Sequence, residues 1–281
     1  MARPLRSTPF LESLAEKLVG EVRPGCRIYW LGQAGFIIEM AGYRIIIDPY
    51  LSNSLAEKYK DGPRSYERMM PAPITIEALD RIDLVLCTHH HTDHMDSATL
   101  APLARRYPNL KFVVPAASLD LAREKIGVED RRLILMVAGQ SIKPLEGLTV
   151  HAVRASHETL ETDAQGQHRF LGYVLESKDC SLFHSGDTVP FDGQSTEIAA
   201  FKPDLALLPV NGRSKELLET GVPGNLFLAE AITLCKEAGI PAMMAHHFGM
   251  FAFNTLSADM IDSAVAPVQL VRAEIRKEYE V

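Results

Sequence analysis

The feature that most constrains the fold is a run of histidine and aspartate, HHHTDH at residues 89–94, one residue after the apolar segment DLVLC. A short apolar segment of this kind predicts a buried strand. His89 and His91 are two residues apart, so in an extended chain both side chains point the same way. Asp93 and His94 fall on the turn into the next helix. One loop can therefore present two ligands to each of two neighbouring divalent metal ions, which histidine and carboxylate both bind.

Three later apolar runs end in the same kinds of side chain. The run LTVHAVRAS is followed by His157, CSLFHS is followed by Gly186-Asp187, and PAMMA is followed by His246-His247. Sites form at strand ends in layered α/β folds, because loops there project side chains over a rigid scaffold. The four cysteines form no Cys-x-x-Cys pair. The histidine–carboxylate set therefore predicts a hydrolytic N/O metal site in place of a structural zinc–thiolate site.

The order of apolar and helical segments predicts an α/β protein. Strand-like runs cover residues 26–32, 35–40 and 43–48, and from residue 83 onward strands alternate with amphipathic segments. Two clusters of strands with interspersed helices indicate a sheet packed on a sheet with helices outside both. No linker or low-complexity tract interrupts the chain, so we expect one domain over residues 1–281.

The two ends of the chain and one internal loop complete this prediction. Residues 1–20 are expected to form an N-terminal helix that begins at Thr8-Pro9, because Leu11, Leu14 and Leu18 recur at helical spacing. Residues 268–281 are expected to form a C-terminal extension, as strand or helix. Residues 50–73 are expected to form a long, partly helical loop.

Composition excludes several classes of protein. The formal net charge of −7 argues against a broad nucleic-acid surface. No segment of about 18 apolar residues is present, so no membrane span is predicted. The first 20 residues contain no continuous apolar stretch typical of an export signal. A cytoplasmic location is the resulting expectation.

The ordered set His89-x-His91-x-Asp93-His94, His157, Asp187 and His247 resembles the signature of the metallo-β-lactamase superfamily. More narrowly, WLGQAGFIIEMAGYRIIIDPYLS, HSGDT, LLPVNGR and FGMFAFNT resemble the branch that contains the L-ascorbate-6-phosphate lactonases and related metal-dependent hydrolases. This resemblance covers residues 26–265 and implies a four-layer αββα sandwich with a metal site at one edge of its two sheets. The substrate does not follow, because one fold hosts many activities.

The resemblance also implies roles for individual residues. One metal site would be made by His89, His91 and His157, and a second by Asp93, His94 and His247, with Asp187 bridging them. Three further residues would support these ligands, namely Asp48, His90 and His246. Asp48 would hydrogen-bond a ligating imidazole, and His90 would face away from the metals or support a ligand. His247 is preferred over His246 as the last ligand on the pattern of residues that follows it.

We therefore expect a metal-dependent hydrolase with one or two Zn²⁺ or Mn²⁺ ions. A metal-bound hydroxide would attack a small, anionic, lactone- or ester-like substrate, and Asp93 or Asp187 would orient the nucleophile and take its proton. The alternative is a phosphodiesterase or nuclease on the same dinuclear site. Related lactonases often carry aspartate at the position of Gly249, which puts lactone-phosphate specificity in doubt.

Two further expectations concern binding partners. Asn211, Arg213 and Lys215 follow the strand DLALLPV and are predicted to bind a phosphate or carboxylate of a small-molecule substrate. The other interpretation of these three residues is a solvated loop. Relatives in the branch self-associate, and residues 1–20 and 268–281 are the segments that could form a homo-oligomer contact.

Overall fold

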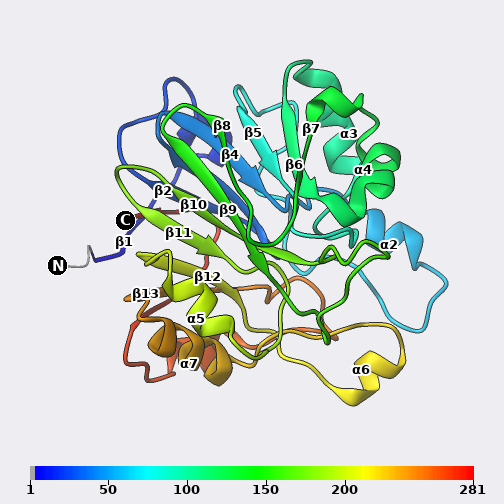
Figure 1. The fold of residues 1–281 in the computed structure, drawn as a ribbon, viewed down its shortest axis with the longest axis vertical. Coiled ribbons are helices and arrows are strands. Elements are labelled where there is room, and N and C mark those ends of the chain that lie inside the picture. Colours follow the sequence, from blue (N-terminus) through cyan, green and yellow to red (C-terminus); the bar gives the residue numbers. More distant parts are fainter. Residues whose placement is uncertain (1–3) are drawn as a thin grey trace.

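The computed structural model describes residues 4–281 as two mixed β-sheets that face each other. Helices cover the outer faces of both sheets (Figure 1), which confirms the predicted four-layer αββα sandwich. The first sheet has the order β1 (Arg6–Pro9), β15 (Lys277–Glu280), β2 (Arg27–Gly32), β3 (Gly35–Met40), β4 (Tyr43–Ile47), β5 (Leu84–Leu86), β6 (Lys111–Pro115) and β7 (Leu133–Met136). The second has the order β14 (Gln269–Arg272), β13 (Ala242–His246), β12 (Leu205–Pro209), β11 (Ser181–His184), β10 (Leu171–Glu176), β9 (Leu148–Arg154) and β8 (Ser141–Leu145).

The helices divide between the two outer faces. α3 and α4 lie against the first sheet, and α5 and α7 lie against the second (Figure 1). No helix among residues 4–281 is long and apolar enough to span a membrane. The α-helices are α1 (Leu14–Lys17), α2 (Ser54–Lys58), α3 (Ser97–Arg106), α4 (Leu119–Ile126), α5 (Gln194–Ala199), α6 (Lys215–Glu219), α7 (Leu228–Ala238) and α8 (Ala258–Asp262), with short 3₁₀ turns at Ala116–Ser118 and Asp130–Arg132.

The central strands of the first sheet are buried on both faces, because their side chains alternate between two apolar clusters. Ile28 and Trp30 of β2 belong to the core that also contains the strands of the second sheet. Tyr29 and Leu31 belong to the core under α1, α3 and α4. A strand buried on both faces reads as a continuous apolar run, which is why the strands between residues 26 and 48 could be predicted from the sequence.

The predicted N-terminal helix over residues 1–20 is confirmed only at Leu14–Lys17, because Arg6–Pro9 form strand β1. β1 pairs with β15, so its backbone hydrogen bonds are made in a sheet. Helix α1 begins after Ser13, whose hydroxyl accepts from the N–H of Glu16 (3.2 Å) while the Glu16 carboxylate accepts from the N–H of Ser13 (2.8 Å). Leu11, which the predicted helix would bury, is 94% exposed. The helical spacing misled because the partner of this segment lies at the other end of the chain.

The segment 268–281 forms strands in both sheets. β14 pairs with β13 at the edge of the second sheet, and β15 lies between β1 and β2 in the first. This segment is therefore part of the fold and not an extension from it.

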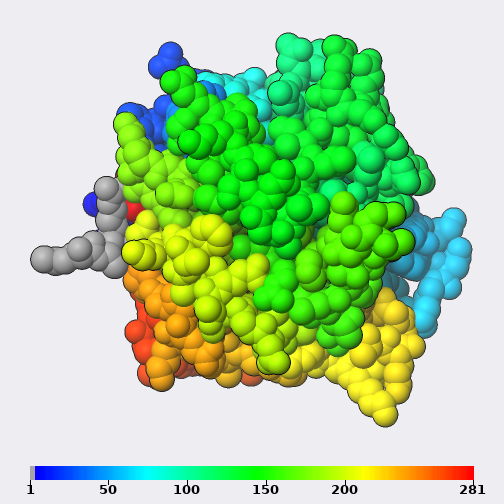
Figure 2. All heavy atoms as spheres, viewed as in Figure 1, coloured from blue at the N-terminus to red at the C-terminus, as the bar shows by residue number. Residues whose placement is uncertain are grey.

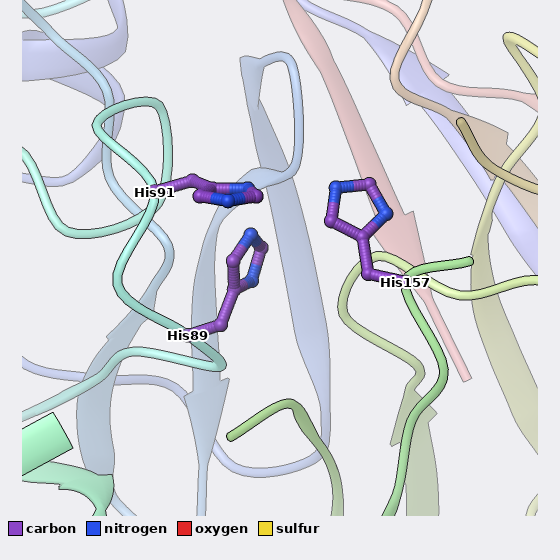
Figure 3. Close-up of side chains that lie close together, drawn as sticks. All are labelled: His89, His91 and His157. Atoms are coloured by element: carbon purple, nitrogen blue, oxygen red, sulfur yellow. The ribbon is translucent and has the colours of Figure 1, made fainter. Parts of the chain in front are cut away.

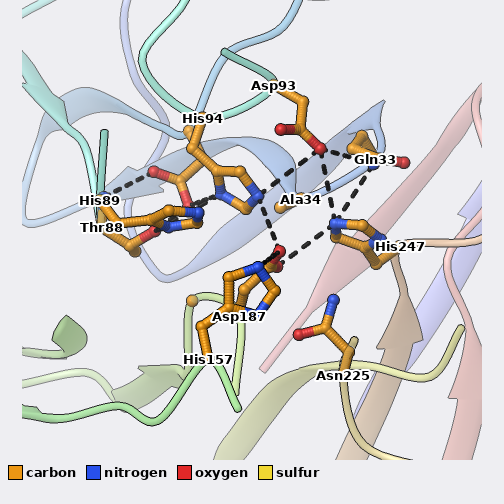
Figure 4. Close-up of polar contacts among 12 residues, drawn as sticks. Gln33, Ala34, Thr88, His89, Asp93, His94, His157, Asp187, Asn225 and His247 are labelled. Carbon is orange, nitrogen blue, oxygen red and sulfur yellow. Dashed lines mark hydrogen bonds and ion pairs between the residues drawn. The ribbon is translucent and has the colours of Figure 1, made fainter. Parts of the chain in front are cut away.

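The strand directions bring the polar strand ends together. In the second sheet β9 and β11 both run antiparallel to β10, and β11, β12 and β13 run parallel to one another. The carboxyl ends of β9, β11 and β13 therefore lie at one edge of that sheet. The loop that follows β5 in the first sheet meets them there (Figure 4).

Candidate metal centre

The seven side chains predicted as metal ligands lie together at this edge. Within the described residues they form three overlapping groups, in each of which the possible ligand atoms lie within 4.8 Å of one another. The groups are His89–His91–His157, His89–His94–Asp187 and Asp93–His94–His247. We call the first group the imidazole set and the third group the mixed set.

The imidazole set brings three rings to one point from two loops. His89 and His91 follow β5, and His157 follows β9 (Figure 3). The Nδ1 atom of His157 donates to the carbonyl oxygen of Gly224 (2.9 Å), which leaves Nε2 for the centre. Burial lowers the pKa of His157 to about 4. This imidazole is therefore neutral near pH 7, which is the form that binds a metal.

The mixed set rests on a buried hydrogen-bond network below it. Nδ1 of His94 donates to Oδ2 of Asp48 (2.7 Å), and the same carboxylate accepts from the N–H and the hydroxyl of Thr88 (2.7 and 2.6 Å). Asp48 is fully buried. The structure thus places Asp48 against a candidate ligand, as its predicted role requires, and fixes which nitrogen of His94 faces the centre.

Asp187 lies between the two sets. Its Oδ2 is 3.3 Å from Nε2 of His94 and 3.5 Å from Nε2 of His157, and its Oδ1 is 3.3 Å from Nε2 of His247 (Figure 4). Burial opposes ionisation of this carboxyl, but the imidazoles of His247 and His94 hold its pKa well below the ordinary value. Gly186 makes the turn with a φ of 61°, and a Cβ there would meet the carbonyl oxygen of Leu171 at 2.8 Å.

The structure adds Gln33, which the sequence did not single out. Its side-chain NH₂ donates to Oδ2 of Asp93 (2.8 Å) and lies 3.2 Å from Nε2 of His247. The backbone carbonyl oxygen of Gln33 accepts from the backbone N–H of His247 (3.0 Å). Gln33 sits in the turn between β2 and β3 with a φ of 51°. A polar residue between the glycines of that turn was the only sequence signal for this role.

His246 and His90 occupy different places. His246 is buried. Its ring stacks on that of His184 with ring centres 5.1 Å apart, and it packs edge-on against Phe36 with ring centres 5.3 Å apart. His247 is the one of the pair that reaches Asp93 and joins a donor group. His90 and His91 both line a cavity that opens onto the candidate ligands, but His90 belongs to none of the three groups. It therefore neither joins the donor groups nor turns away from the cavity.

The predicted substrate-binding residues lie outside this cavity. The Arg213 guanidinium makes two hydrogen bonds to the Glu230 carboxylate (2.6 and 2.7 Å) and lies over the ring of Phe227. Lys215 is exposed and lies 3.6 Å from Glu219. Asn211 hydrogen-bonds Asn254, which does line the cavity. A nearby acid already neutralises each cation, and neither Arg213 nor Lys215 lines the cavity.

A cavity of about 290 Å³ opens onto the candidate ligands. Its outer wall comes from the segment around α2 and from residues 221–223 and 251–254. The segments around α2 and α6 project from the same side of the molecule (Figure 2). The Arg64 guanidinium joins them, with Nη1 2.5 Å from the hydroxyl of Thr220. The expectation that residues 50–73 form a long, partly helical loop is confirmed, and this loop supplies part of the cavity wall.

The residues at this centre fit a divalent metal. Among the seven candidate ligands, four buried atoms have no hydrogen-bond partner in the described residues, namely Nε2 of His89, Nε2 of His94, Oδ1 of Asp187 and Nδ1 of His247. Buried polar atoms without partners are costly. Nitrogen and carboxylate donors of this kind bind Zn²⁺ and Mn²⁺. The donor set therefore has the chemistry and the unmet bonding capacity of a metal site.

Comparison with known proteins identifies the family. A model of the β-lactamase superfamily domain matches residues 43–248. A UPF0173 metal-dependent hydrolase of Myxococcus xanthus is 32% identical over 80% of this chain and 71% of its own length, and one of Caldivirga maquilingensis is 31% identical over 65% and 69%. A solved structure of a possible metal-dependent hydrolase from Veillonella parvula has a TM-score of 0.73 at 15% identity, over 92% of this chain and 99% of that one. The chain therefore belongs to the metallo-β-lactamase superfamily, as its histidine and aspartate pattern predicted.

Proposed function

We propose that the chain is a metal-dependent hydrolase that acts on a small ester-like or lactone substrate. The observation that carries this proposal is the position of Asp187, whose carboxylate lies within 3.5 Å of imidazoles from both donor sets. Such a carboxylate can be shared by two adjacent divalent ions. The relatives named as metal-dependent hydrolases support the same reaction class.

The seven side chains would hold one or two Zn²⁺ or Mn²⁺ ions. When bound, these ions would lower the pKa of a water molecule and polarise the electrophile. His89, His91 and His157 would hold one ion, Asp93, His94 and His247 the other, and Asp187 would contact both. Asp48 and Gln33 would keep their ligands oriented through the hydrogen bonds described above.

Asp93 is our candidate for moving the proton. Its carboxylate lines the cavity, and Gln33 holds one of its oxygens. Burial opposes its ionisation, but His94 and His247 lower its pKa below the ordinary value. Asp93 is therefore ionised near pH 7 and can accept a proton from an attacking water. The more deeply buried Asp187 would orient that water.

A phosphodiesterase on the same donor set is the alternative. Among the described residues that line the cavity, Lys58 is the one lysine or arginine. A polyanionic nucleic acid needs many phosphate contacts, so this cavity favours a substrate with at most one anionic group. A small lactone or ester meets that condition, as does a small phosphodiester, whereas a nucleic acid does not.

The test is a substrate panel on protein loaded with Zn²⁺ or Mn²⁺. The panel contains unsubstituted and substituted lactones, simple esters and bis(p-nitrophenyl) phosphate, with Asp187→Asn as the matched inactive control. We expect lactone or ester hydrolysis that is lost in the control. Turnover of the phosphodiester alone would favour the alternative, and no turnover of any of them would contradict the proposed function.

A further inference from the structure

The outer wall of the cavity is a continuous cluster of four aromatic rings, Tyr59, Tyr66, Phe251 and Phe253. Tyr59 stacks on Tyr66 with ring centres 4.6 Å apart. Tyr66 in turn packs edge-on against Phe253 (4.8 Å) and Phe251 (5.4 Å). The two tyrosines come from the loop over residues 50–73, and the two phenylalanines follow β13. We call these four residues the aromatic wall.

The aromatic wall lines the same cavity as the candidate metal ligands. The cavity lining includes all four rings together with Asp187, His157 and His247. Further apolar side chains complete its outer part, namely Leu55, Val222 and Pro223. A molecule that reaches Asp187 from solvent therefore passes between apolar surfaces.

Apart from the candidate ligands, Gln33 and His90, the polar groups of the described lining side chains are those of Lys58, Thr92 and Asn254 and the hydroxyls of Tyr59 and Tyr66. The Lys58 ammonium lies 5.0 Å from the ring centre of Tyr59, and the amide oxygen of Asn254 accepts from Asn211. Arg64 lies 5.8 Å from the ring of Phe253, but its guanidinium is bound to Thr220 and lies 3.6 Å from Glu216.

The faces of the four rings offer no hydrogen-bond partner to a hydroxyl, so on the wall a polar substituent could be satisfied only by the hydroxyls of Tyr59 and Tyr66. Flat apolar groups, in contrast, bury area against aromatic faces and pack well with them. The wall therefore favours a planar, apolar substituent.

We propose that the natural substrate carries an aromatic or similarly flat apolar group, which lies on the aromatic wall while the hydrolysable carbonyl faces Asp187. This assignment rests on the proposed hydrolase function for the identity of the reacting group. The exposed position of Lys58 allows one carboxylate or phosphate on the same substrate, at the mouth of the cavity.

The kinetic test compares two lactones with the same ring, γ-butyrolactone and γ-phenyl-γ-butyrolactone, on metal-loaded protein. Tyr66→Ala and Phe253→Ala change half-buried wall residues and spare the more deeply buried Phe251. We expect the ratio of kcat/KM for the phenyl lactone over the parent lactone to fall about tenfold or more in each variant, because the lost contact is apolar. Phe227→Ala, which changes an exposed ring outside the cavity, should leave the ratio unchanged.

A binding measurement separates this assignment from the proposed function. Isothermal titration with the ring-opened acids, γ-hydroxybutanoate and its γ-phenyl derivative, requires no turnover. We expect the phenyl acid to bind at least about tenfold more tightly, and this advantage to disappear in Tyr66→Ala and Phe253→Ala. Equal binding of the two acids, or an advantage that survives in both variants, would overturn the assignment even if lactones are hydrolysed. Loss of all turnover with the binding advantage intact would contradict only the lactonase function.

Discussion

The imidazole set and the mixed set lie on either side of Asp187 but are supported in different ways. The mixed set rests on Asp48 and Gln33, which reach it from β4 and from the turn after β2. Within the imidazole set, His157 is held by a backbone carbonyl, that of Gly224, and His89 lies 3.1 Å from the hydroxyl of its neighbour Thr88. The two sets therefore differ in how far their geometry depends on residues that bind no metal.

Their charges differ as well. The imidazole set contains no carboxylate of its own, whereas the mixed set includes Asp93, and both adjoin Asp187. An added anionic ligand increases the attraction for a divalent cation. When metal is bound, the mixed set would hold its ion with one carboxylate more than the imidazole set, while Asp187 would contribute to both.

The largest expected effect comes from Asp187→Asn, which removes the charge shared by both sets and keeps the shape of the side chain. We expect kcat/KM to fall on the order of a thousandfold or more, because groups that act as a unit fail together. Bound metal, measured by elemental analysis, should fall in both sets. Retention of full metal content and of activity would show that Asp187 is not shared.

Asp48→Asn tests the network under the mixed set. It removes the carboxylate that accepts from His94 and Thr88, so we expect metal affinity of the mixed set to fall about 10–100-fold. The free energy of unfolding should fall by about 1–3 kcal/mol, because buried donors lose their acceptor. Titration with a metal indicator and urea unfolding measure the two effects. Equal weakening of both ions would remove the proposed difference between the sets.

Gln33→Leu sharpens the same comparison with a smaller change. The leucine leaves Asp93 and His247 without their shared donor, and we expect about a tenfold loss of affinity at the mixed set. The imidazole set should keep its ion at wild-type affinity. Competition with a chelator followed by elemental analysis of the retained ions reads out the difference. An unchanged affinity would mean that Gln33 has no part in holding the centre.

Arg213→Ala is expected to have the smallest effect on catalysis. Its guanidinium is paired with Glu230 outside the cavity, so kcat/KM should stay within about twofold of wild type. Stability should fall by no more than about 1 kcal/mol, because the pair is partly exposed. Steady-state kinetics and thermal unfolding check both statements. A large rise in KM alone would restore the original substrate-binding interpretation.

The sequence could predict features that depend on neighbouring residues, but not those that depend on partners far away in the chain. The spacing of His89, His91, Asp93 and His94 identified the donor loop, because the periodicity of an extended chain decides which side chains point the same way. Two features of the structure could not be predicted from the sequence, for a common reason. The pairing of β1 with β15 and that of Arg213 with Glu230 both depend on partners that the local pattern does not reveal.

Gln33 and the residues of the aromatic wall can be seen in the sequence, but nothing there indicates that they belong to one site. Gln33 and the aromatic wall acquire their meaning from the packing of the β2–β3 turn, the loop over residues 50–73 and the segment after β13. Tyr59 and Tyr66 could have been noted as aromatic residues in a long loop, yet only the fold brings them to Phe253. Strand order places these segments, and no local pattern encodes it.

The bound-metal stoichiometry of the wild type and of two single variants tests the central claim most directly. Elemental analysis of protein saturated with Zn²⁺ or Mn²⁺ and then desalted gives ions per chain. The two donor sets predict two ions in the wild type and one each in His91→Ala and His247→Ala, the remaining ion being held by the opposite set. Unchanged metal content in both variants would contradict the assignment of these histidines as ligands.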